Sequence, residues 1–328
     1  KTDVNYVRFM EDSMVQAAEK AFHEAQEAKV GLSIADDTGV GTNRRNPGGP
    51  ADHQVPVLLV KNARTDAHIA CMLVCSMHPT VLHEDSTLIS GDFPGMARLY
   101  LQNYILGENC PVLHHTGPSG NQSPRHVTRA NTFEEAERLG NILGKAVEKA
   151  IGEITFRDDV KISASTSAIP DLPPKTFPTR KNAEENLKTA AGKLEKIRNE
   201  NASKHQIRTA ECDWYGAEEV LTLAGAAEDG LLDTFYQSCL PAEIQVIRIG
   251  DWYFVGWPGE IFIEYALAVK NYQPNTAVIS LANGELQGYI VTKQAAEEGG
   301  YEASNALFCH QTGDIFVNQT RQLIRKLL

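Results

Sequence analysis

The side chains of this chain best suited to chemistry are an imidazole, a hydroxyl, a carboxylate and a phenol that lie far apart in the sequence. His78, Ser123, Glu260 and Tyr289 each follow an apolar, strand-like run and stand close to glycine or proline. A sheet presents reactive groups at the carboxyl ends of its strands in this way. Together, the four residues predict a metal-dependent hydrolase.

Three of these side chains are of types that can bind zinc. His78 closes an apolar strand just before a proline, where a neutral imidazole can act as a ligand. Glu260 follows a Pro-Gly pair at the expected mouth of a helix, whose dipole favours an ionised carboxylate. Tyr289 is an uncommon kind of ligand, because a phenol has a pKa of about 10 and must lose its proton. Taken singly, His78 also fits a structural histidine, and Glu260 a helix cap.

Ser123 lies in a loop that contains Gly117 and Gly120. Glycine lets backbone N–H groups turn toward a ligand or a developing oxyanion. The Ser123 hydroxyl could attack a substrate, donate a hydrogen bond or cap a turn, and clusters of Gly, Ser, Asn and Pro are standard turn chemistry. These three interpretations stay open at the level of the residues.

The apolar periodicity predicts the elements that would hold these residues. Strands are expected at residues 30–35, 55–60, 68–77, 111–115, 160–169, 243–249, 252–257 and 277–281, and helices at 11–29, 92–106, 132–151, 180–201, 217–227, 260–269 and 314–328. The nearly unbroken apolar run at 68–77 is typical of a strand buried on both faces. Gly250-Asp251 is a strong hairpin signal. The expected fold is therefore α/β, a layered domain with a central mixed β-sheet flanked by helices.

The whole chain, residues 1–328, is expected to form one catalytic domain. Four prolines between residues 170 and 178 precede a long amphipathic helix. Residues 170–230 could therefore be a helical insertion that packs over the sheet or roofs the site.

Composition excludes several classes of partner. The chain has 31 basic and 42 acidic residues, a formal net charge of −11, which argues against nucleic acid as a partner. No run approaches the roughly 20 apolar residues of a membrane span. The six cysteines show no Cys-x-x-Cys spacing and are expected to be buried free thiols.

The four candidate residues, in this order, resemble the neutral/alkaline (non-lysosomal) ceramidase family. The residues at 78–80 resemble its His-Gly-Thr segment, and 89–92 its Ser-Gly-Asp turn; 120–124 resemble its Gly-Asp-Val-Ser-Pro loop. The segments 258–260 and 288–292 look like those that supply a Glu and a Tyr to zinc. Tyr301 resembles a second site tyrosine, and Asn43-Arg44 an Asn-Arg segment whose arginine holds substrate. The similarity runs from about residue 44 to about 304.

This resemblance implies a zinc-dependent amidohydrolase that cleaves an N-acyl amide bond through a zinc-activated water. His78, Glu260 and Tyr289 would bind the metal, and Ser123, Tyr301 and Arg44 would position the amide or stabilise charge on its oxygen. The substrate would be a small N-acyl amide or a lipid of sphingolipid type. A secreted or periplasmic location would fit the family, although the chain shows no targeting signal, and the oligomeric state cannot be predicted.

Three departures from the family pattern matter. The family's His-x-His segment has no match before Arg44, so the chain is expected to begin after that segment and to be N-terminally incomplete. The family's long enzymes continue into a β-sandwich, whereas this chain stops at Leu328, so it is expected to resemble the short, single-domain members. Asn121 also replaces the aspartate of the serine loop, which removes a charge near the site. The missing His-x-His segment and Asn121 motivate an alternative, a non-catalytic ceramidase-fold binding protein. A metal-independent serine hydrolase is a third interpretation.

Overall fold

Two four-stranded mixed sheets form the centre of the molecule. The computed structural model describes residues 3–84, 86–200 and 202–328. The first sheet has the order β1-β3-β4-β5 and the second β11-β9-β8-β7. Their strands are β1 (Ala28–Asp36), β3 (Gln54–Asn62), β4 (His68–Cys75), β5 (Val112–Thr116), β7 (Ile162–Ile169), β8 (Ala242–Ile249), β9 (Trp252–Trp257) and β11 (Thr276–Ser280).

Strands of the first sheet bury both faces, as the apolar run at 68–77 predicted. In β3, Val57 and Leu59 belong to a core with the helices, while Leu58 belongs to a second core shared with the other sheet. In β4, Leu73 and Val74 divide in the same way. This period-two alternation places one sheet face on helices and the other on a sheet.

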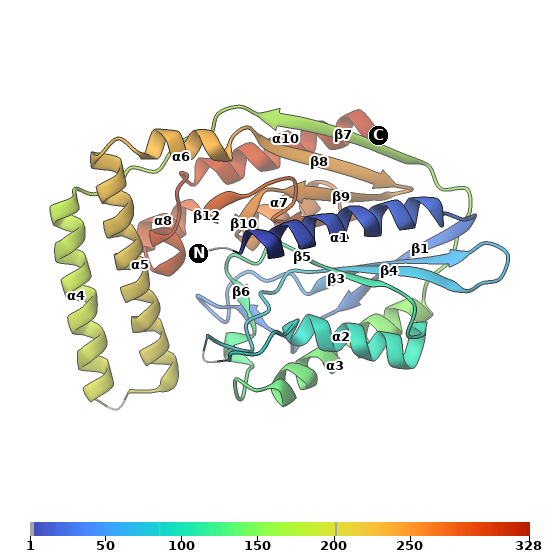
Figure 1. Ribbon diagram of the computed structural model, residues 1–328, viewed down its shortest axis with the longest axis horizontal. Helices are drawn as coiled ribbons and strands as arrows, with labels where there is room; N and C mark the ends of the chain where they lie inside the picture. The colour runs from blue at the N-terminus through green and yellow to red at the C-terminus, as the bar shows by residue number, and fades with distance from the viewer. Residues whose placement is uncertain (1–2, 85, 201) are drawn as a thin grey trace.

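Helices cover the two outer faces, so the layers follow the order helix, sheet, sheet, helix (Figure 1). The first sheet carries α2 (Asp92–Leu101), continued by a π-helical turn, and α3 (Phe133–Gly152). The second carries α7 (Ile263–Tyr272) and α10 (Gln311–Leu327). The α/β class and the mixed pairing are thus confirmed, with the central sheet divided into two stacked sheets.

Both sheets repeat one pairing scheme. In the first, β1-β3 and β3-β4 are antiparallel and β4-β5 is parallel, with α2 between the parallel strands. In the second, β7-β8 and β8-β9 are antiparallel and β9-β11 is parallel, with α7 in between. A parallel pair requires such a crossover. The scheme brings the segments that follow β4 and β9 into corresponding positions.

Two short ladders lie where the site residues are found. β2 (Thr42–Asn43) pairs with β6 (Gln122–Ser123), which a short 3-10 turn, Pro124–His126, follows. β10 (Gly259–Ile261) pairs in parallel with β12 (Leu286–Ile290). The sequence predicted a helix that begins at residue 260 and a polar loop, without strand or helix, at 283–304. Both expectations are wrong, because residue 260 lies in β10 and the loop contains β12, α8 (Lys293–Glu298) and α9 (Tyr301–Ser304).

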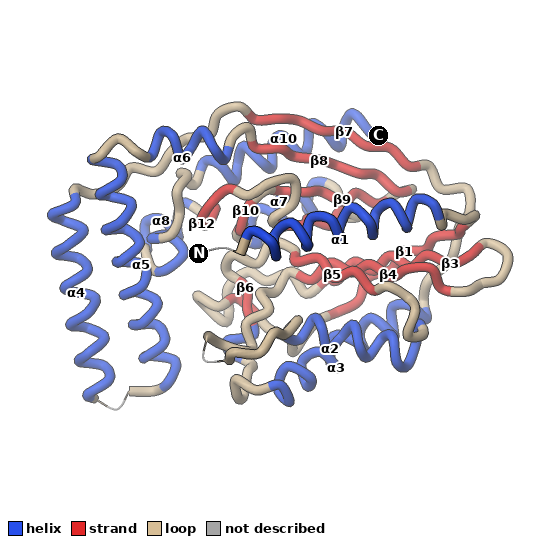
Figure 2. Tube along the Cα trace, viewed as in Figure 1, coloured by secondary structure: helices blue, strands red, loops and turns tan. Residues whose placement is uncertain are grey.

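A helical hairpin stands at one end of the sheet stack (Figure 2). It consists of α4 (Arg180–Asn199) and α5 (Lys204–Glu228), followed by α6 (Leu232–Cys239). The interpretation of 170–230 as an insertion stays a prediction. The second helix of the hairpin is longer than predicted and begins at Lys204 instead of residue 217.

The amino-terminal helix α1 (Val4–His23) differs from the other long helices. None of its residues, all of which the structure describes, is buried. Within the described ranges, we find no helix with both the length and the apolar character needed to cross a bilayer. The six cysteines are free thiols, and three of them are buried.

Candidate active site

The β10-β12 ladder places Glu260 beside Tyr289. The two residues are register partners in this parallel pair, so their side chains leave the ladder at the same level. Gly288, just before Tyr289, has a φ of 75°, and a Cβ atom there would lie 1.8 Å from the carbonyl oxygen of Asn305. Only glycine fits this turn, which fixes where the phenol begins.

His78 reaches the same place from the other sheet. Its backbone N–H donates to the carbonyl of Gln122 at 3.2 Å, which ties it to the serine loop. Its Nδ1 lies 3.4 Å from the hydroxyl of Ser119, and its Nε2 lies 3.3 Å from Glu260 Oε1. Nε2 is buried and has no hydrogen-bond partner among the described residues. An imidazole nitrogen is thus held against a carboxylate without a good hydrogen bond.

Arg44 closes the group on a further side. Its guanidinium carbon lies 5.4 Å from the centre of the Tyr289 ring, and its Nε donates to Glu302 at 2.8 Å. Arg45 donates to the second oxygen of Glu302, also at 2.8 Å. Glu302 is 5% exposed and therefore needs such partners. The arginine pair and Glu302 fix the loop after β2 to α9.

Tyr301 starts α9, next to Glu302. Its ring centroid lies 5.9 Å from that of Tyr289, in an edge-to-face arrangement. The two tyrosines predicted for the site are therefore neighbours, as their sequence separation alone could not establish.

Ser123 lies at the β2-β6 ladder, opposite Thr42. The side chain is 3% exposed, and its Oγ accepts a hydrogen bond from the backbone N–H of Arg125 at 3.3 Å. Among the described residues no histidine is hydrogen-bonded to this hydroxyl. The turn-capping interpretation is thus satisfied, while a Ser-His pair, which a serine nucleophile requires, is not formed at Ser123.

The side chain of Asn121 has a structural role beside the expected site. Its Nδ2 donates to Glu264 at 2.8 Å, and its Oδ1 accepts from Gln122 and from the first N–H of α7, at Ile263. The side chain is 1% exposed, and both ends of its amide are hydrogen-bonded. It fastens the serine loop to α7, so the replacement of aspartate here serves packing next to Glu264.

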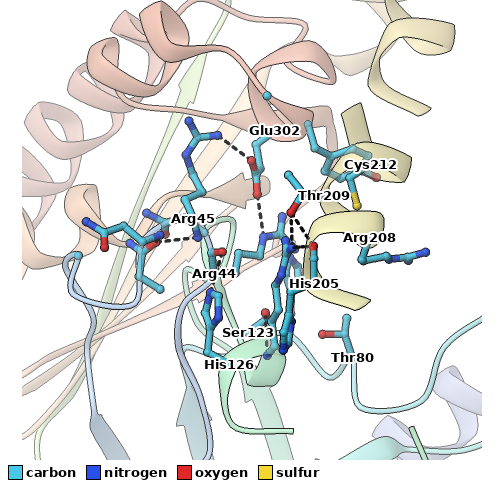
Figure 3. Close-up of a pocket in the computed structure, with 18 of the residues that line it drawn as sticks. Arg44, Arg45, Thr80, Ser123, His126, His205, Arg208, Thr209, Cys212 and Glu302 are labelled. Carbon is cyan, nitrogen blue, oxygen red and sulfur yellow. Dashed lines mark hydrogen bonds and ion pairs between the residues drawn. The ribbon is translucent and has the colours of Figure 1, made fainter. Parts of the chain in front are cut away.

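One large cavity joins these residues. It has a volume of about 1510 Å³, and its walls include His78, Ser123, Glu260, Tyr289 and Tyr301. The amino-terminal half of α5 forms another wall, with His205, Arg208, Thr209 and Cys212 (Figure 3). All six predicted site residues, Arg44 included, therefore line a single cavity.

Burial sets the protonation states around the cavity. Burial, helped by the positive charge of Arg44, lowers the pKa of His78 to about 3, so its imidazole is neutral at pH 7. Burial raises the pKa of Glu260 above its ordinary value, while Arg44 acts in the opposite direction. Burial also raises the pKa of the Tyr289 phenol, again opposed by Arg44. Desolvation thus dominates all three groups.

The side chains that converge here include few of the usual metal ligands. Among the described residues, no group of three or more His, Cys, Asp and Glu side chains could hold a metal ion. The converging groups here are one imidazole, one carboxylate and one phenol. The unpartnered, neutral Nε2 of His78 beside Glu260 is the arrangement expected of a nitrogen ligand, so these residues fit a zinc ion.

Sequence reasoning missed several residues that shape the cavity. Glu302 was overlooked although it follows Tyr301 directly, and its partner Arg44 is 258 residues away. Arg125 was overlooked although it lies two residues after Ser123. The polar face of α5 carried no signal, because solvent-exposed helices look alike in sequence.

This arrangement of layers and ladders is a fold of the neutral ceramidase type. It is shared with a neutral ceramidase from Pseudomonas aeruginosa, with a TM-score of 0.66 at 15% sequence identity over 97% of this chain. It is also shared with a ceramidase complexed with C2, with a TM-score of 0.65 at 14% identity over 94% of this chain. The resemblance inferred from the motifs is thereby confirmed at the level of the fold.

The chain spans about half of the length of those two proteins, 55% in each case. No family model matches the sequence. No curated protein sequence matches it either.

Proposed function

We propose that the protein is a zinc-dependent hydrolase of the neutral ceramidase type, which cleaves an amide bond. The observation that carries the proposal is that His78, in the segment after β4, lies against Glu260 in β10. Glu260 in turn lies beside Tyr289 in β12. Residues from three distant parts of the chain meet at one point of a cavity. The shared fold with two ceramidases supports the same conclusion.

In this proposal His78, Glu260 and Tyr289 hold the zinc ion. Three protein ligands with a free position are typical of a catalytic zinc site, whereas structural sites use four. Zinc, when bound, supplies a Lewis acid that polarises the amide carbonyl and makes water a better nucleophile at neutral pH. Ser119, 3.4 Å from Nδ1 of His78, orients the imidazole.

The phenol of Tyr289 must lose its proton to bind metal well, although burial raises its pKa. Arg44 opposes that effect, because its guanidinium lies over the Tyr289 ring. A positive charge next to the phenolate lowers the cost of deprotonation. Glu302 in turn holds Arg44 in place.

Ser123, Arg44 and Tyr301 would contact the substrate. The buried Nη2 of Arg44 has no partner among the described residues and can donate to an amide oxygen. Tyr301 presents a phenol from α9, next to Tyr289, and Ser123 presents a hydroxyl from the serine loop. Preorganised donors of this kind stabilise the charge that develops on a carbonyl oxygen during attack.

The proposal is tested by metal content and turnover in the full-length protein. We expect about one zinc per chain, and we expect Tyr289→Phe to bind zinc more weakly in a chelator competition. Tyr301→Phe is the matched control, because it removes a hydroxyl from the neighbouring ring without removing a proposed ligand. Ser123→Ala should keep its zinc and lose most of its amidase turnover.

The result has clear alternatives. Absence of stoichiometric metal, with turnover that resists chelators, would exclude the zinc mechanism and favour a serine hydrolase. Bound metal without turnover of any amide would favour the alternative of a non-catalytic ceramidase-fold binding protein.

A further inference from the structure

The walls of the cavity carry few aliphatic side chains. Of the described residues that line it, Leu82 is the one aliphatic side chain larger than alanine or proline. Most of the residues of the wall are charged or polar, so its other apolar surface comes from rings, such as Phe262 and Tyr215, and from the carbon atoms of polar side chains. A long acyl or sphingoid chain gains affinity by leaving water for apolar surface. This wall presents that surface in patches between polar groups, without a continuous aliphatic lining.

Arg125 is a partly buried cation of this wall that has no acidic partner among the described residues. Arg125 uses its Nη2 to donate to the backbone carbonyl of His205 at 3.1 Å and to the hydroxyl of Thr209 at 2.6 Å. Within the described ranges, it forms no ion pair, and its Nε is enclosed without a hydrogen bond. Two other arginines of the same wall are paired with carboxylates, Arg44 with Glu302 and Arg208 with Glu84, while Arg129 is exposed to solvent.

Arg125 is partly buried and unpaired in a chain whose net charge is −11. Carboxylates are abundant, yet Arg125 contacts two neutral oxygens instead. Leaving a partly buried charge unpaired costs free energy, which an incoming anion would recover. Arginine is also the side chain best matched to carboxylate and phosphate groups.

Two histidines and two further arginines lie around Arg125. His126 and His205 approach each other with ring centroids 6.1 Å apart (Figure 3). The positive charges of Arg208, Arg125 and Arg44 all act on the half-buried thiol of Cys212, although burial still raises its pKa overall. The three guanidinium groups therefore surround one part of the cavity, between the serine loop and α5.

We propose that the cavity takes a short, water-soluble N-acyl amide that carries an anionic group, and that Arg125 recognises this group. The inference rests on the amide hydrolysis proposed above, and it names the class of substrate. Because Arg125 lies two residues after Ser123, the anion would sit close to the scissile amide, as in an N-acyl amino acid. An uncharged lipid amide would leave Arg125 unpaired.

The test uses four amides that share one acetamidomethyl core. N-acetylglycine carries a carboxylate, N-acetylaminoethyl phosphate a phosphate, N-acetylethanolamine a neutral hydroxyl and N-acetylethylenediamine a cation. We expect both anions to bind more tightly than the neutral amide by about tenfold or more, the usual effect of a hydrogen bond to a charged group. Binding is measured by calorimetry, and kcat/KM separately. The two anionic arms distinguish a carboxylate from a phosphate.

Variants assign the preference to Arg125. Arg125→Gln should reduce binding of N-acetylglycine by about 10- to 100-fold and that of N-acetylethanolamine by less than about threefold. Thr209→Val removes one contact of Arg125 and keeps its charge, so the preference for anions should persist. Arg129→Gln removes an equal charge from an exposed position in the same loop and should also keep the preference. Arg125→Lys, which retains charge without the planar fork, should be intermediate.

Acyl length supplies a second measurement. Each methylene buried in an apolar channel would raise kcat/KM by about fourfold. We expect less than a twofold change in total from N-acetylglycine to N-hexanoylglycine. A steep rise with chain length, or equal binding of the neutral and anionic amides, overturns the inference while leaving amide hydrolysis intact. If anions bind in an Arg125-dependent way but no amide is turned over, the anion site is supported and the proposed hydrolase activity is rejected.

Discussion

Replacing Asn121 by aspartate would set two carboxyl groups against each other beside the serine loop. In the native protein, Nδ2 of Asn121 donates to Glu264 Oε2 at 2.8 Å. Asn121→Asp turns this donor into a second acceptor at the same distance. The two contacts of Oδ1, with Gln122 and Ile263, remain in the variant and cancel from the comparison.

The size of the effect follows from two competing costs. Two unit charges about 3 Å apart repel by about 5 kcal/mol at an effective dielectric constant of about 20. Protonating one carboxyl at pH 7, about three pH units above its ordinary pKa, costs about 4 kcal/mol and restores a hydrogen bond. The cheaper route sets the loss, so the free energy of unfolding should fall by about 3 to 4 kcal/mol at pH 7.

The loss must depend on pH with a defined sign. The pKa of the introduced carboxyl is higher in the folded than in the unfolded chain, so the destabilisation grows as pH rises above the unfolded value. At pH 5 protonation costs only about 1.5 kcal/mol, so urea unfolding should show a penalty smaller by about 2 to 3 kcal/mol than at pH 7. Adding Glu264→Gln supplies an amide donor and should recover most of the stability. A penalty that is equal at both pH values, or that persists in the double variant, would refute this account of Asn121.

Two further predictions concern the supports of the site. Nδ1 of His53 lies 2.7 Å from Oδ1 of Asp37 and donates to it, and this contact raises the pKa of His53. Its contribution to stability is full below the unfolded pKa of about 6.5 and is lost as pH rises through the folded value. The urea midpoint should therefore decline between pH 6 and 8, and His53→Gln should abolish that decline. Gly288→Ala introduces both a strained φ and a clash with Asn305, and should lower the thermal midpoint more than Gly284→Ala, where φ is 114° but no atom lies within 4 Å of the added Cβ. Equal shifts in the two glycine variants would show that the clash is relieved without cost.

The strands that carry the site were predictable because their signals are local. The apolar runs that became β3 and β4 are long enough to exclude a surface strand, and Gly250-Asp251 does connect β8 to β9. His78 and Ser123 could be found because each follows such a run. The position of a residue at the end of a strand follows from the strand itself, and the apolar pattern of the sequence predicts that strand.

The rest of the site depends on contacts between distant segments. Strand β12 is short, contains Gly288 at a positive φ and lies in a polar stretch, so it carries no alternating pattern. The stacking of two sheets is also hidden, because an apolar residue facing a helix and one facing a second sheet look the same in sequence. The pairing of Arg44 with Glu302 joins residues 258 positions apart, and nothing local announces it.

The repeated strand scheme explains why the candidate ligands meet at the junction of the two halves. His78 lies three residues after the end of β4 at Cys75, and Glu260 lies three residues after the end of β9 at Trp257. Each strand is the first member of the parallel pair in its sheet, so the two segments leave corresponding positions. His78 follows the first sheet and Glu260 follows the second. A metal ion held between these two side chains would therefore bind more tightly when the two sheets are packed together than when they are separated. Metal binding should therefore stabilise the packing between the sheets, by mass action, in proportion to the affinity of the site.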